Sequence, residues 1–437
     1  MPTKTLSYRA REIEAWVEAN MVDSNGIVYT FVDRITGKPI ANDIVEAIDP
    51  IRLKVGTTEG WWAYENCTMV TAAYMQAMLY RYEVEGDISA LARARRCFDA
   101  LRYIYERGKE LEEGFMPKIY GDQFTLETSS DQILFATVAL DHYHRHADDA
   151  EKAEASRMIT EIVRFFVKRE YKYTYFGLKD MQWPLARFTC ETLMAYKHSG
   201  EELFKNEYDR LLALGVNEYP GEEQIRPKLA GKMKPSRLEQ EEGGWLLTYP
   251  TNLAQMDLTE LDYLLRNDPG NKWATRWKRS IIQMWNEGMN MISADGRAYS
   301  FMIMDFETNE IRTLDSRFLP RDADRPKSES FGEPDTDAWS FFPFMTYVHS
   351  SKGSVSTLYA RAGIQVATHF PREITIRPLA RRIIQSFDLY DLTYFDEPER
   401  FDPRFKYMTN QISGDSVTHW LWGYWQGRER NIFSESE

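Results

Sequence analysis

The feature that most constrains the fold is an alternation along the chain between helices that are apolar on all sides and helices that are apolar on one side. Residues 127–146, ETSSDQILFATVALDHYHRH, are apolar on nearly every helical face in the middle, which predicts a helix buried all round. Residues 150–170 carry apolar side chains on one face and charges between them, which predicts an amphipathic helix with one wet face. This pairing recurs along the chain.

Six segments are predicted as helices buried on all sides, and about six as amphipathic helices. The buried segments are residues 61–82, 127–146, 182–198, 250–265, 336–349 and 413–427. The amphipathic segments are residues 5–20, 88–108, 150–170, 201–214, 271–288 and 354–369, with residues 375–392 as an additional helix. Their alternation predicts an all-α (α/α)6 toroid in which residues 1–437 form a single domain of six helical hairpins, an outer ring around an inner ring.

The connections between these helices are unequal in length. The link from an amphipathic helix to the next buried helix is long, whereas the link from a buried helix to the amphipathic helix that follows it is short. The long links are residues 21–60, 109–126, 215–249, 289–335 and 370–412. They are expected to gather over one mouth of the toroid and to contain short β-hairpins at residues 26–39, with a turn at Thr36-Gly37, and at residues 297–313. The amino ends of the inner helices meet at this mouth, where free N–H groups and the helix dipole favour bound oxygens and anions.

Charge and composition narrow the class of partner. The chain has 54 Lys and Arg against 67 Asp and Glu, a net charge of −13, which disfavours nucleic acid and anionic membrane surfaces. The first residues lack an apolar signal region, and no stretch approaches the roughly 20 apolar residues of a membrane span, so a cytoplasmic protein is expected. The three cysteines lie far apart without a CxxC spacing, which fits a reducing compartment. Aromatic residues at 14% exceed what the core needs and favour stacking on sugar rings, so a carbohydrate partner is expected.

The arrangement of helices resembles that of the six-hairpin glycosidase superfamily. Its members include glycoside hydrolases, unsaturated glucuronyl hydrolases, sugar epimerases and, in related toroids, polysaccharide lyases. Ser129-Ser130-Asp131-Gln132, at the start of an inner helix, is similar to the inner-helix start that carries the acid and base Asp of unsaturated glucuronyl hydrolases. The resemblance implies hydrolysis of a small oligosaccharide, with uronic-acid sugars as one class of substrate.

Glycoside hydrolysis needs one protonated carboxyl group and one carboxylate. Asp131, Asp337 and Glu127 are the candidate catalytic acids, because they lie near the starts of predicted inner helices. Acidic residues at the mouth that are candidates for substrate binding are Glu59, Asp257 and Asp335. The alternative for each is helix capping, which the dipole favours regardless of function. Asp131 is preferred because the neighbouring serines could cap the helix instead.

Aromatic and basic residues complete the predicted mouth. The aromatic candidates for stacking on sugar are Trp61, Trp62, Tyr120, Trp183, Trp245, Trp339 and Trp420, and the alternative for each is core packing. Arg187, one turn after Trp183, needs a carboxylate partner from the protein or from a ligand. The basic residues between Arg226 and Arg237 would hold a uronate, or form a solvated loop. A lyase or epimerase would instead abstract a proton with Tyr120 or His419, and a third hypothesis is a toroid that binds sugar without catalysis.

No metal or cofactor is predicted. His142, His144 and His146 follow one another at spacings of two, which diverge on a helix, and the three fit a last turn as partners of the dipole. Cys67 and Cys190 are expected to be inert packing residues. P-loop, Rossmann and HExxH patterns are absent from the sequence. The oligomeric state and the identity of the sugar stay open.

Overall fold

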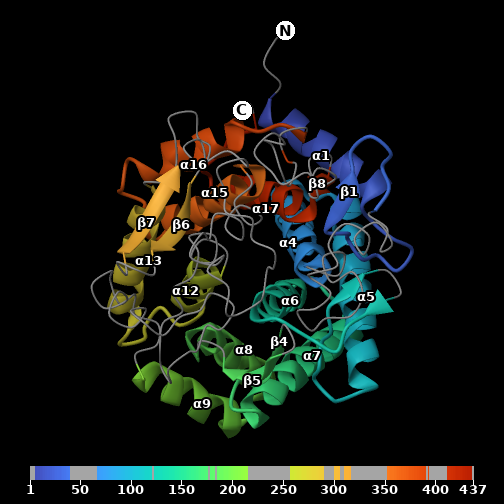
Figure 1. Cartoon of the computed structure of the whole chain (residues 1–437), viewed down its shortest axis with the longest axis vertical. Helices are drawn as coiled ribbons and strands as arrows, with labels where there is room; N and C mark the ends of the chain where they lie inside the picture. The colour runs from blue at the N-terminus through green and yellow to red at the C-terminus, as the bar shows by residue number, and fades with distance from the viewer. Residues whose placement is uncertain are drawn as a thin grey trace.

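The computed structural model describes residues 5–39, 66–120, 123–175, 178–182, 185–214, 256–289, 300–305, 310–315, 352–389, 392 and 411–435. Six of its helices surround a common axis (Figure 1). They are α4 (Cys67–Glu85), α6 (Ser130–Tyr143), α8 (Thr189–Ser199), α12 (Leu258–Asn267), α15 (Lys352–His369) and α17 (Gly414–Glu429). Each contacts the next in this order and α17 contacts α4, so the inner ring is closed.

A second ring of helices lies outside the first (Figure 1). Each of its members contacts its own inner partner helix. The outer helices are α5 (Ile88–Lys109) on α4, α7 (Asp149–Lys168) on α6, α9 (Glu202–Ala213) on α8, α13 (Ala274–Met289) on α12, α16 (Ile376–Gln385) on α15 and α1 (Leu6–Asn20) on α17. Helices α5, α7, α13 and α16 also contact the next inner helix. The predicted all-α (α/α)6 toroid is therefore confirmed.

Two of the predicted helix assignments were wrong within this architecture. Residues 354–369 were expected to form a wet helix, but α15 is an inner helix whose described side chains from 360 to 367 are all buried. Its polar residue Arg361 is fully buried and donates through Nη1 to Thr259 Oγ1 at 2.6 Å, on the neighbouring inner helix α12. The additional helix of residues 375–392 is the outer partner α16, and α1 is the outer partner of the last inner helix. Residues 336–349 lie outside the described part of the chain.

Inner helices carry small residues where their neighbours approach. Gly363 of α15 is one example, because a Cβ at this position would meet the ring of Trp285 on α13 at 2.6 Å. The glycine therefore lets an indole of the outer ring pack directly on the backbone of the inner ring. Trp285 is 2% exposed and belongs to the continuous hydrophobic core between the rings.

The ring closes through a buried carboxylate of the first helix. Glu14 of α1 is 2% exposed, and its Oε1 accepts a hydrogen bond from the indole Nε1 of Trp425 on α17 at 2.8 Å. Its Oε2 pairs with the guanidinium of Arg81 on α4. One side chain thus joins the first, second and last helices of the described chain, which fixes how the two ends of the sequence meet.

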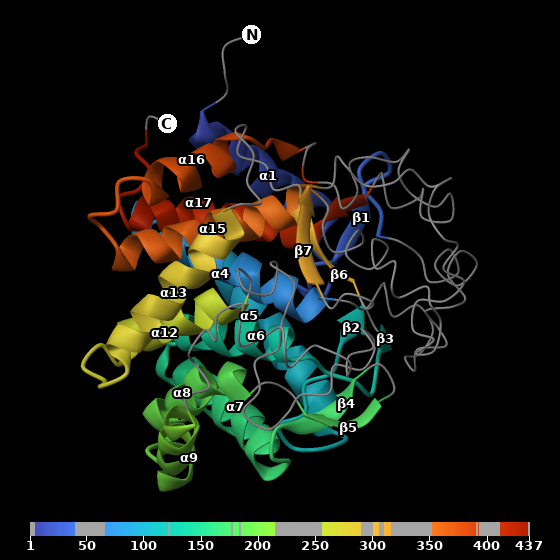
Figure 2. The same cartoon turned by 60° about the vertical axis from the view of Figure 1, so that its left-hand side comes forward.

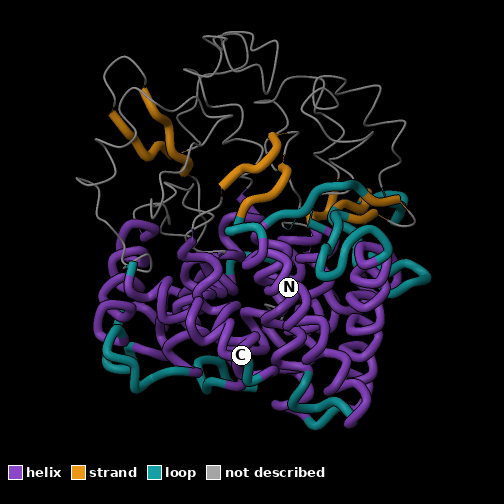
Figure 3. Tube along the Cα trace, turned by 90° about the horizontal axis from the view of Figure 1, so that it is seen from below, coloured by secondary structure: helices purple, strands orange, loops and turns teal. Residues whose placement is uncertain are grey.

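Four antiparallel two-stranded sheets lie on one side of the helical rings (Figures 2 and 3). They pair β1 (Phe31–Asp33) with β8 (Gln411–Ser413), β2 (Ile119–Tyr120) with β3 (Gln123–Phe124), β4 (Lys172–Tyr175) with β5 (Leu178–Gln182), and β6 (Ser300–Asp305) with β7 (Glu310–Asp315). Strands β3, β5 and β8 each lead into the amino end of an inner helix. The strand-bearing side is therefore the predicted mouth.

The structure forms the two predicted β-hairpins to different extents. The hairpin expected at residues 297–313 is formed by β6 and β7, which pair from Ser300 with Asp315 to Asp305 with Glu310. The segment of residues 26–39 makes the predicted turn, since Gly37 has φ +66° and its N–H donates to the Asp33 carbonyl. Val32 of β1 also pairs with Pro39 in an isolated antiparallel bridge, and Asp33 N–H donates to the Lys38 carbonyl at 2.9 Å, so the predicted local hairpin is present in short form. Strand β1 pairs in addition with β8, near the other end of the sequence.

Candidate active site

A buried arginine lies at the centre of the candidate site, where three inner helices begin. Arg187 belongs to a short 3-10 helix, η2 (Leu185–Phe188), that leads into α8, and it is 2% exposed. Its Nη1 donates to Ser130 Oγ on α6 at 3.0 Å. The Ser130 hydroxyl in turn lies 4.0 Å from the sulfur of Met256, which immediately precedes Asp257 at the start of α12. This chain of contacts brings the amino ends of α6, α8 and α12 together.

Three buried carboxyl groups surround Arg187. Glu191 lies in the first turn of α8, Asp257 is the residue before α12, and Glu260 lies in the first turn of α12. Their exposed fractions are 1%, 7% and 2%. The positive charge of Arg187 acts on all three carboxyl groups. Three acids beside one cation carry more potential negative charge than the cation can neutralise, which favours protonation of some of them.

The protonation states of these acids differ. Burial raises the pKa of Asp257 to about 6, against the opposing charge of Arg187. Burial, followed by the charge of Asp257, raises the pKa of Glu260 well above its usual value. Burial also raises the pKa of Glu191 well above its usual value, although Arg187 opposes this. Burial therefore favours the protonated forms of Glu191 and Glu260, whereas the pKa of Asp257 is raised to about 6.

Several buried polar groups at this end of the ring are not satisfied within the described part of the chain. Both carboxyl oxygens of Glu191, Oε1 of Glu260 and both ring nitrogens of His419 have no hydrogen-bond partner there. Buried polar groups are nearly always hydrogen-bonded in folded proteins. Such groups, gathered at the amino ends of inner helices, are available to bind a polar ligand.

Asp131 lies beside this cluster. It is half-buried, and its Oδ1 accepts from the backbone N–H of Gln132 at 2.9 Å. Burial and then the negative charge of Asp131 raise the pKa of the Tyr173 hydroxyl on β4 well above its usual value, so the two side chains are neighbours. Ser129 is the N-cap residue of α6, but its side chain makes no capping hydrogen bond. Its Oγ accepts instead from the side chain of Gln132 at 3.1 Å, and the Oγ of Ser130 accepts from Arg187, a contact between helices.

Aromatic and cationic side chains from α6, α15 and α17 form a second buried group. The guanidinium of Arg361 lies 4.6 Å from the Trp422 ring and 5.3 Å from the Phe135 ring. His419 contacts Phe135 edge-on, with ring centroids 5.3 Å apart. Burial and then the charge of Arg361 lower the pKa of His419 well below its usual value, so its imidazole is neutral at neutral pH. The group therefore combines a neutral base with a cation stacked on aromatic rings.

The structure brings some of the predicted site residues together. Asp131, Arg187 and Asp257 lie at the amino ends of α6, α8 and α12, which contacts of Ser130 with Arg187 and Met256 bring together, and His419 lies on α17 beside Arg361. Glu127 is buried between β3 and α6, and its carbonyl accepts from Lys118 N–H at 3.0 Å.

Two aromatic candidates have different surroundings. Tyr120 lies in β2 with its ring centroid 4.8 Å from that of Tyr29. Trp420 is fully buried, and its indole donates to the carbonyl of Ile384 on α16 at 3.1 Å. Trp420 therefore packs towards the outer ring, which corrects its expected place at the mouth. The remaining candidates, and the basic residues from 226 to 237, lie outside the described residues. These candidates are Glu59, Trp61, Trp62, Trp183, Trp245, Asp335, Asp337 and Trp339.

Sequence reasoning missed Glu191, Glu260, Tyr173 and Arg361. The available signal was the presence of acids in segments otherwise predicted to be buried, since Glu191 follows Phe188-Thr-Cys and Glu260 precedes Leu261. A charged residue within an all-round apolar helix is costly unless it is paired, protonated or functional.

Thiol chemistry is disfavoured in the same region. Cys190 is fully buried, and burial, followed by the charges of Glu260 and Glu191, raises its pKa well above the usual value. Burial likewise raises the pKa of Cys67 to about 12. A thiolate nucleophile needs a lowered pKa and access to solvent. Within the described residues, no helix is long and apolar enough to cross a lipid bilayer.

The fold is that of a class of helical toroids seen in sugar-processing enzymes. No family model matches the sequence, and a search of curated proteins finds no match. One similar solved structure is an unsaturated glucuronyl hydrolase specific for heparin, with a TM-score of 0.53 and 11% identity, covering 98% of this chain and 97% of that chain. Another is a sugar epimerase from a ruminal bacterium, with a TM-score of 0.52 and 12% identity, covering 98% and 100%. The resemblance to six-hairpin glycosidases is thus confirmed for the fold, and at these identities for the fold alone.

Proposed function

We propose that the protein is a carbohydrate-active enzyme, and that it is a glycoside hydrolase acting on a small oligosaccharide. The observation that carries the proposal is the buried carboxyl group of Asp257, whose pKa is raised to about 6 beside Arg187 at the mouth of the toroid. A general acid works best when its pKa lies near the working pH. The fold shared with a glucuronyl hydrolase makes uronic-acid glycosides the first class of substrate to test.

In the proposed mechanism, Asp257 donates its proton to the leaving glycosidic oxygen while the bond to the anomeric carbon breaks. The Asp131 carboxylate, half-buried and across the Ser130–Met256 contact, either attacks the anomeric carbon or takes a proton from the attacking water. Glu127, and Asp337 outside the described residues, are the alternative carboxylates.

Arg187 is proposed to position substrate. Its guanidinium lies among buried carboxyl groups whose protonated forms are favoured by burial, and a planar guanidinium is suited to binding a uronate or the developing charge of the reaction. Glu191 and Glu260, as neutral carboxyl groups, are able both to donate and to accept hydrogen bonds to sugar hydroxyls.

The test is a pH–rate profile on aryl glycosides, aryl glucuronides and unsaturated uronyl disaccharides. We expect activity on one of these classes, with a limb near pH 6 that Asp257→Asn removes along with most of the rate. Asp131→Asn is expected to lose activity by a large factor while remaining folded. Glu113→Gln, at an exposed acid, serves as the matched control and is expected to keep full activity. Full activity of a folded Asp131→Asn or Asp257→Asn protein would refute the proposed roles.

A second function, epimerisation, is favoured by the group around His419. A neutral, buried imidazole beside the cationic Arg361 is suited to removing a proton next to a sugar carbonyl, with the guanidinium stabilising the resulting enolate oxygen. Incubation with free sugars in D2O distinguishes the two functions. Deuterium incorporation without new reducing ends, abolished by His419→Asn, supports epimerisation, whereas new reducing ends without deuterium support hydrolysis. Binding of sugars without turnover would instead support a non-catalytic toroid.

A further inference from the structure

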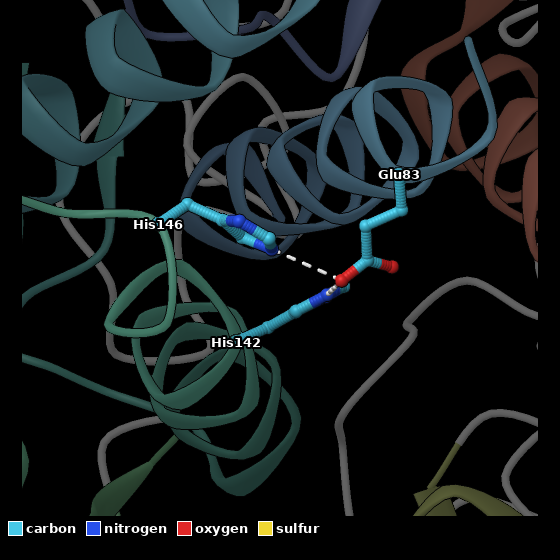
Figure 4. A group of neighbouring side chains, drawn as sticks. All are labelled: Glu83, His142 and His146. Atoms are coloured by element: carbon cyan, nitrogen blue, oxygen red, sulfur yellow. Dashed lines mark hydrogen bonds and ion pairs between the residues drawn. The ribbon is translucent and has the colours of Figure 1, made fainter. Parts of the chain in front are cut away.

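A second cluster of polar side chains lies at the end of the ring opposite the mouth. Glu83 near the end of α4, His142 near the end of α6 and His146 just after α6 point towards one another (Figure 4). One ligand atom from each lies within 4.8 Å of the other two. His142 is twelve residues from Ser130 on the same helix, about 18 Å at 1.5 Å per residue, so this cluster is separate from the acids around Arg187.

The spacing of two residues between the histidines predicts no metal site, but the spacing that matters in the structure is four, from His142 to His146. His142 and His146 converge on one carboxylate oxygen, Glu83 Oε1, which lies 2.9 Å from His142 Nε2 and 3.0 Å from His146 Nε2. His144, between them, turns away and packs edge-on against His198, with ring centroids 4.8 Å apart. Two histidines four residues apart with a glutamate from another helix are a ligand set that zinc sites use.

The two ring nitrogens of His142 face more hydrogen-bond acceptors than a neutral imidazole can donate to, which independently favours a cation. The Gln76 side chain donates through Nε2 to the Val138 carbonyl at 2.9 Å, which fixes its Oε1 as the atom that faces His142. Nδ1 of His142 lies 2.7 Å from this Oε1, and its Nε2 lies 2.9 Å from the Glu83 carboxylate. Both ring nitrogens therefore face acceptors. A neutral imidazole carries one hydrogen, so it cannot donate to both.

We propose that Glu83, His142 and His146 bind a divalent cation of the zinc class. When the hydrogen of His142 is on Nδ1 and is donated to Gln76, the lone pair of Nε2 faces the Glu83 carboxylate oxygen, and the two repel each other. A cation between them would be bound by both atoms and would remove this repulsion. A hydrogen bond from the second nitrogen to a side-chain oxygen is the usual arrangement that orients a metal-binding histidine. Zn–N bonds of about 2.0–2.1 Å in a tetrahedron place ligand atoms about 3.3 Å apart. The Glu83 oxygen would separate from each nitrogen by a few tenths of an ångström, and the two histidine nitrogens, which lie within 4.8 Å, would take up the same spacing by side-chain rotation.

Access to the site and its position suggest what the cation does. The side chains of Glu83 and His146 are 23% and 19% exposed, which gives the ion a path from solvent and leaves a fourth position for water. Gln76 and His142 also line a small cavity between the inner helices. The cation would join the carboxyl ends of α4 and α6, and it would hold the first two hairpins of the ring together independently of chemistry at the mouth.

The test uses chelator-treated full-length protein titrated with ZnCl2 in a calorimeter and by thermal unfolding. We expect one Zn2+ per chain and a rise in Tm of about 3 °C at a hundredfold excess over the Kd. Glu83→Gln and His146→Ala are expected to lose both effects. The matched control His144→Ala is expected to keep them, because His144 faces away from Glu83.

Gln76→Met tests the supporting hydrogen bond and is expected to weaken Zn2+ binding by about 10- to 100-fold without abolishing it. Co2+ in place of Zn2+ gives a visible absorption spectrum that reports the coordination geometry. The proposal is overturned if no stoichiometric binding occurs, or if His144→Ala reduces binding as much as His146→Ala. The Tm of each variant without metal shows whether a loss reflects misfolding, and Gln76→Met serves if a ligand variant does not fold.

Discussion

Replacing Asp257 with asparagine is expected to stabilise the protein at neutral pH. The pKa of Asp257 rises from 3.8 to about 6 on folding, because burial disfavours its charge. A raised folded-state pKa means that this group's contribution to stability is present below about pH 4 and is lost as the pH rises through about 6. A difference of about two pKa units corresponds to about 3 kcal/mol, and asparagine, which cannot ionise, avoids this loss.

The expected change in melting temperature follows from the size of the chain. An unfolding entropy of about 2.1 cal/mol/K per residue over 437 residues is about 0.9 kcal/mol/K, so about 3 kcal/mol corresponds to about 3 °C. Calorimetry or a thermal-shift assay on both proteins should give equal Tm values near pH 4 and a variant about 3 °C higher at pH 7. Equal Tm values of the two proteins at both pH values, or a variant less stable than wild type at pH 7, would refute the inference that burial of the ionised Asp257 carboxylate lowers the stability of the fold.

Asp262, five residues after Asp257, serves as a control because its replacement by asparagine is expected to lower stability rather than raise it. Although burial alone would raise its pKa, the charges of Arg266 and Arg430 and a hydrogen bond from His369 hold the pKa of Asp262 far below its usual value. Asp262→Asn leaves these cations without their carboxylate and is expected to cost about 3–5 kcal/mol at pH 7. The same chemical change on one helix therefore raises Tm at position 257 and lowers it at position 262.

Three further changes test the packing and electrostatics of the rings. Gly114→Ala is expected to lower stability by about 1–3 kcal/mol in a thermal-unfolding assay, because Gly114 has φ +84° and a Cβ there would lie 2.1 Å from a backbone carbonyl oxygen of α7; an unchanged Tm would contradict this. Trp420→Phe removes the indole donor to α16 and is expected to cost about 1–3 kcal/mol without changing sugar turnover; a selective loss of turnover would restore Trp420 to the mouth. Arg361→Met is expected to raise the pKa of His419, measured by NMR of labelled histidine, since the Arg361 charge lowers it; no change would show that burial acts alone.

The ring architecture was predictable because burial pattern alone distinguishes inner from outer helices. Residues 127–146 show this well, since every described residue of α6 except Asp131 is buried. Helix α15 was assigned to the wrong ring because Arg361 and Gln365 make its sequence look half-polar. The two side chains instead hydrogen-bond to each other at 3.2 Å inside the ring, a partnership that no linear pattern reveals.

The site was predictable only in part, for a related reason. Asp131 stood out because an acid at a helix start is visible in sequence, whereas Asp257 was a candidate further along its predicted helix, residues 250–265. Glu191 and Glu260 were not recognised, because an acidic residue within a helix is usually exposed to solvent, and the sequence alone does not show that these two are buried. What makes them unusual is a contact between helices that begin 69 residues apart, from Thr189 to Leu258. The histidine cluster was likewise judged from neighbours along one helix, whereas its third member comes from α4.

Glu191 and Glu260 at the mouth are predicted to stay protonated at neutral pH, because burial raises the pKa of both carboxyl groups. Infrared difference spectroscopy measures this directly, because a protonated carboxyl group has a C=O stretching band that a carboxylate lacks. Wild-type protein at pH 7, compared with Glu260→Gln and Glu191→Gln, is predicted to show a protonated-carboxyl band that each variant loses in part. Absence of that band in the wild type, or a band unchanged in both variants, would contradict the account.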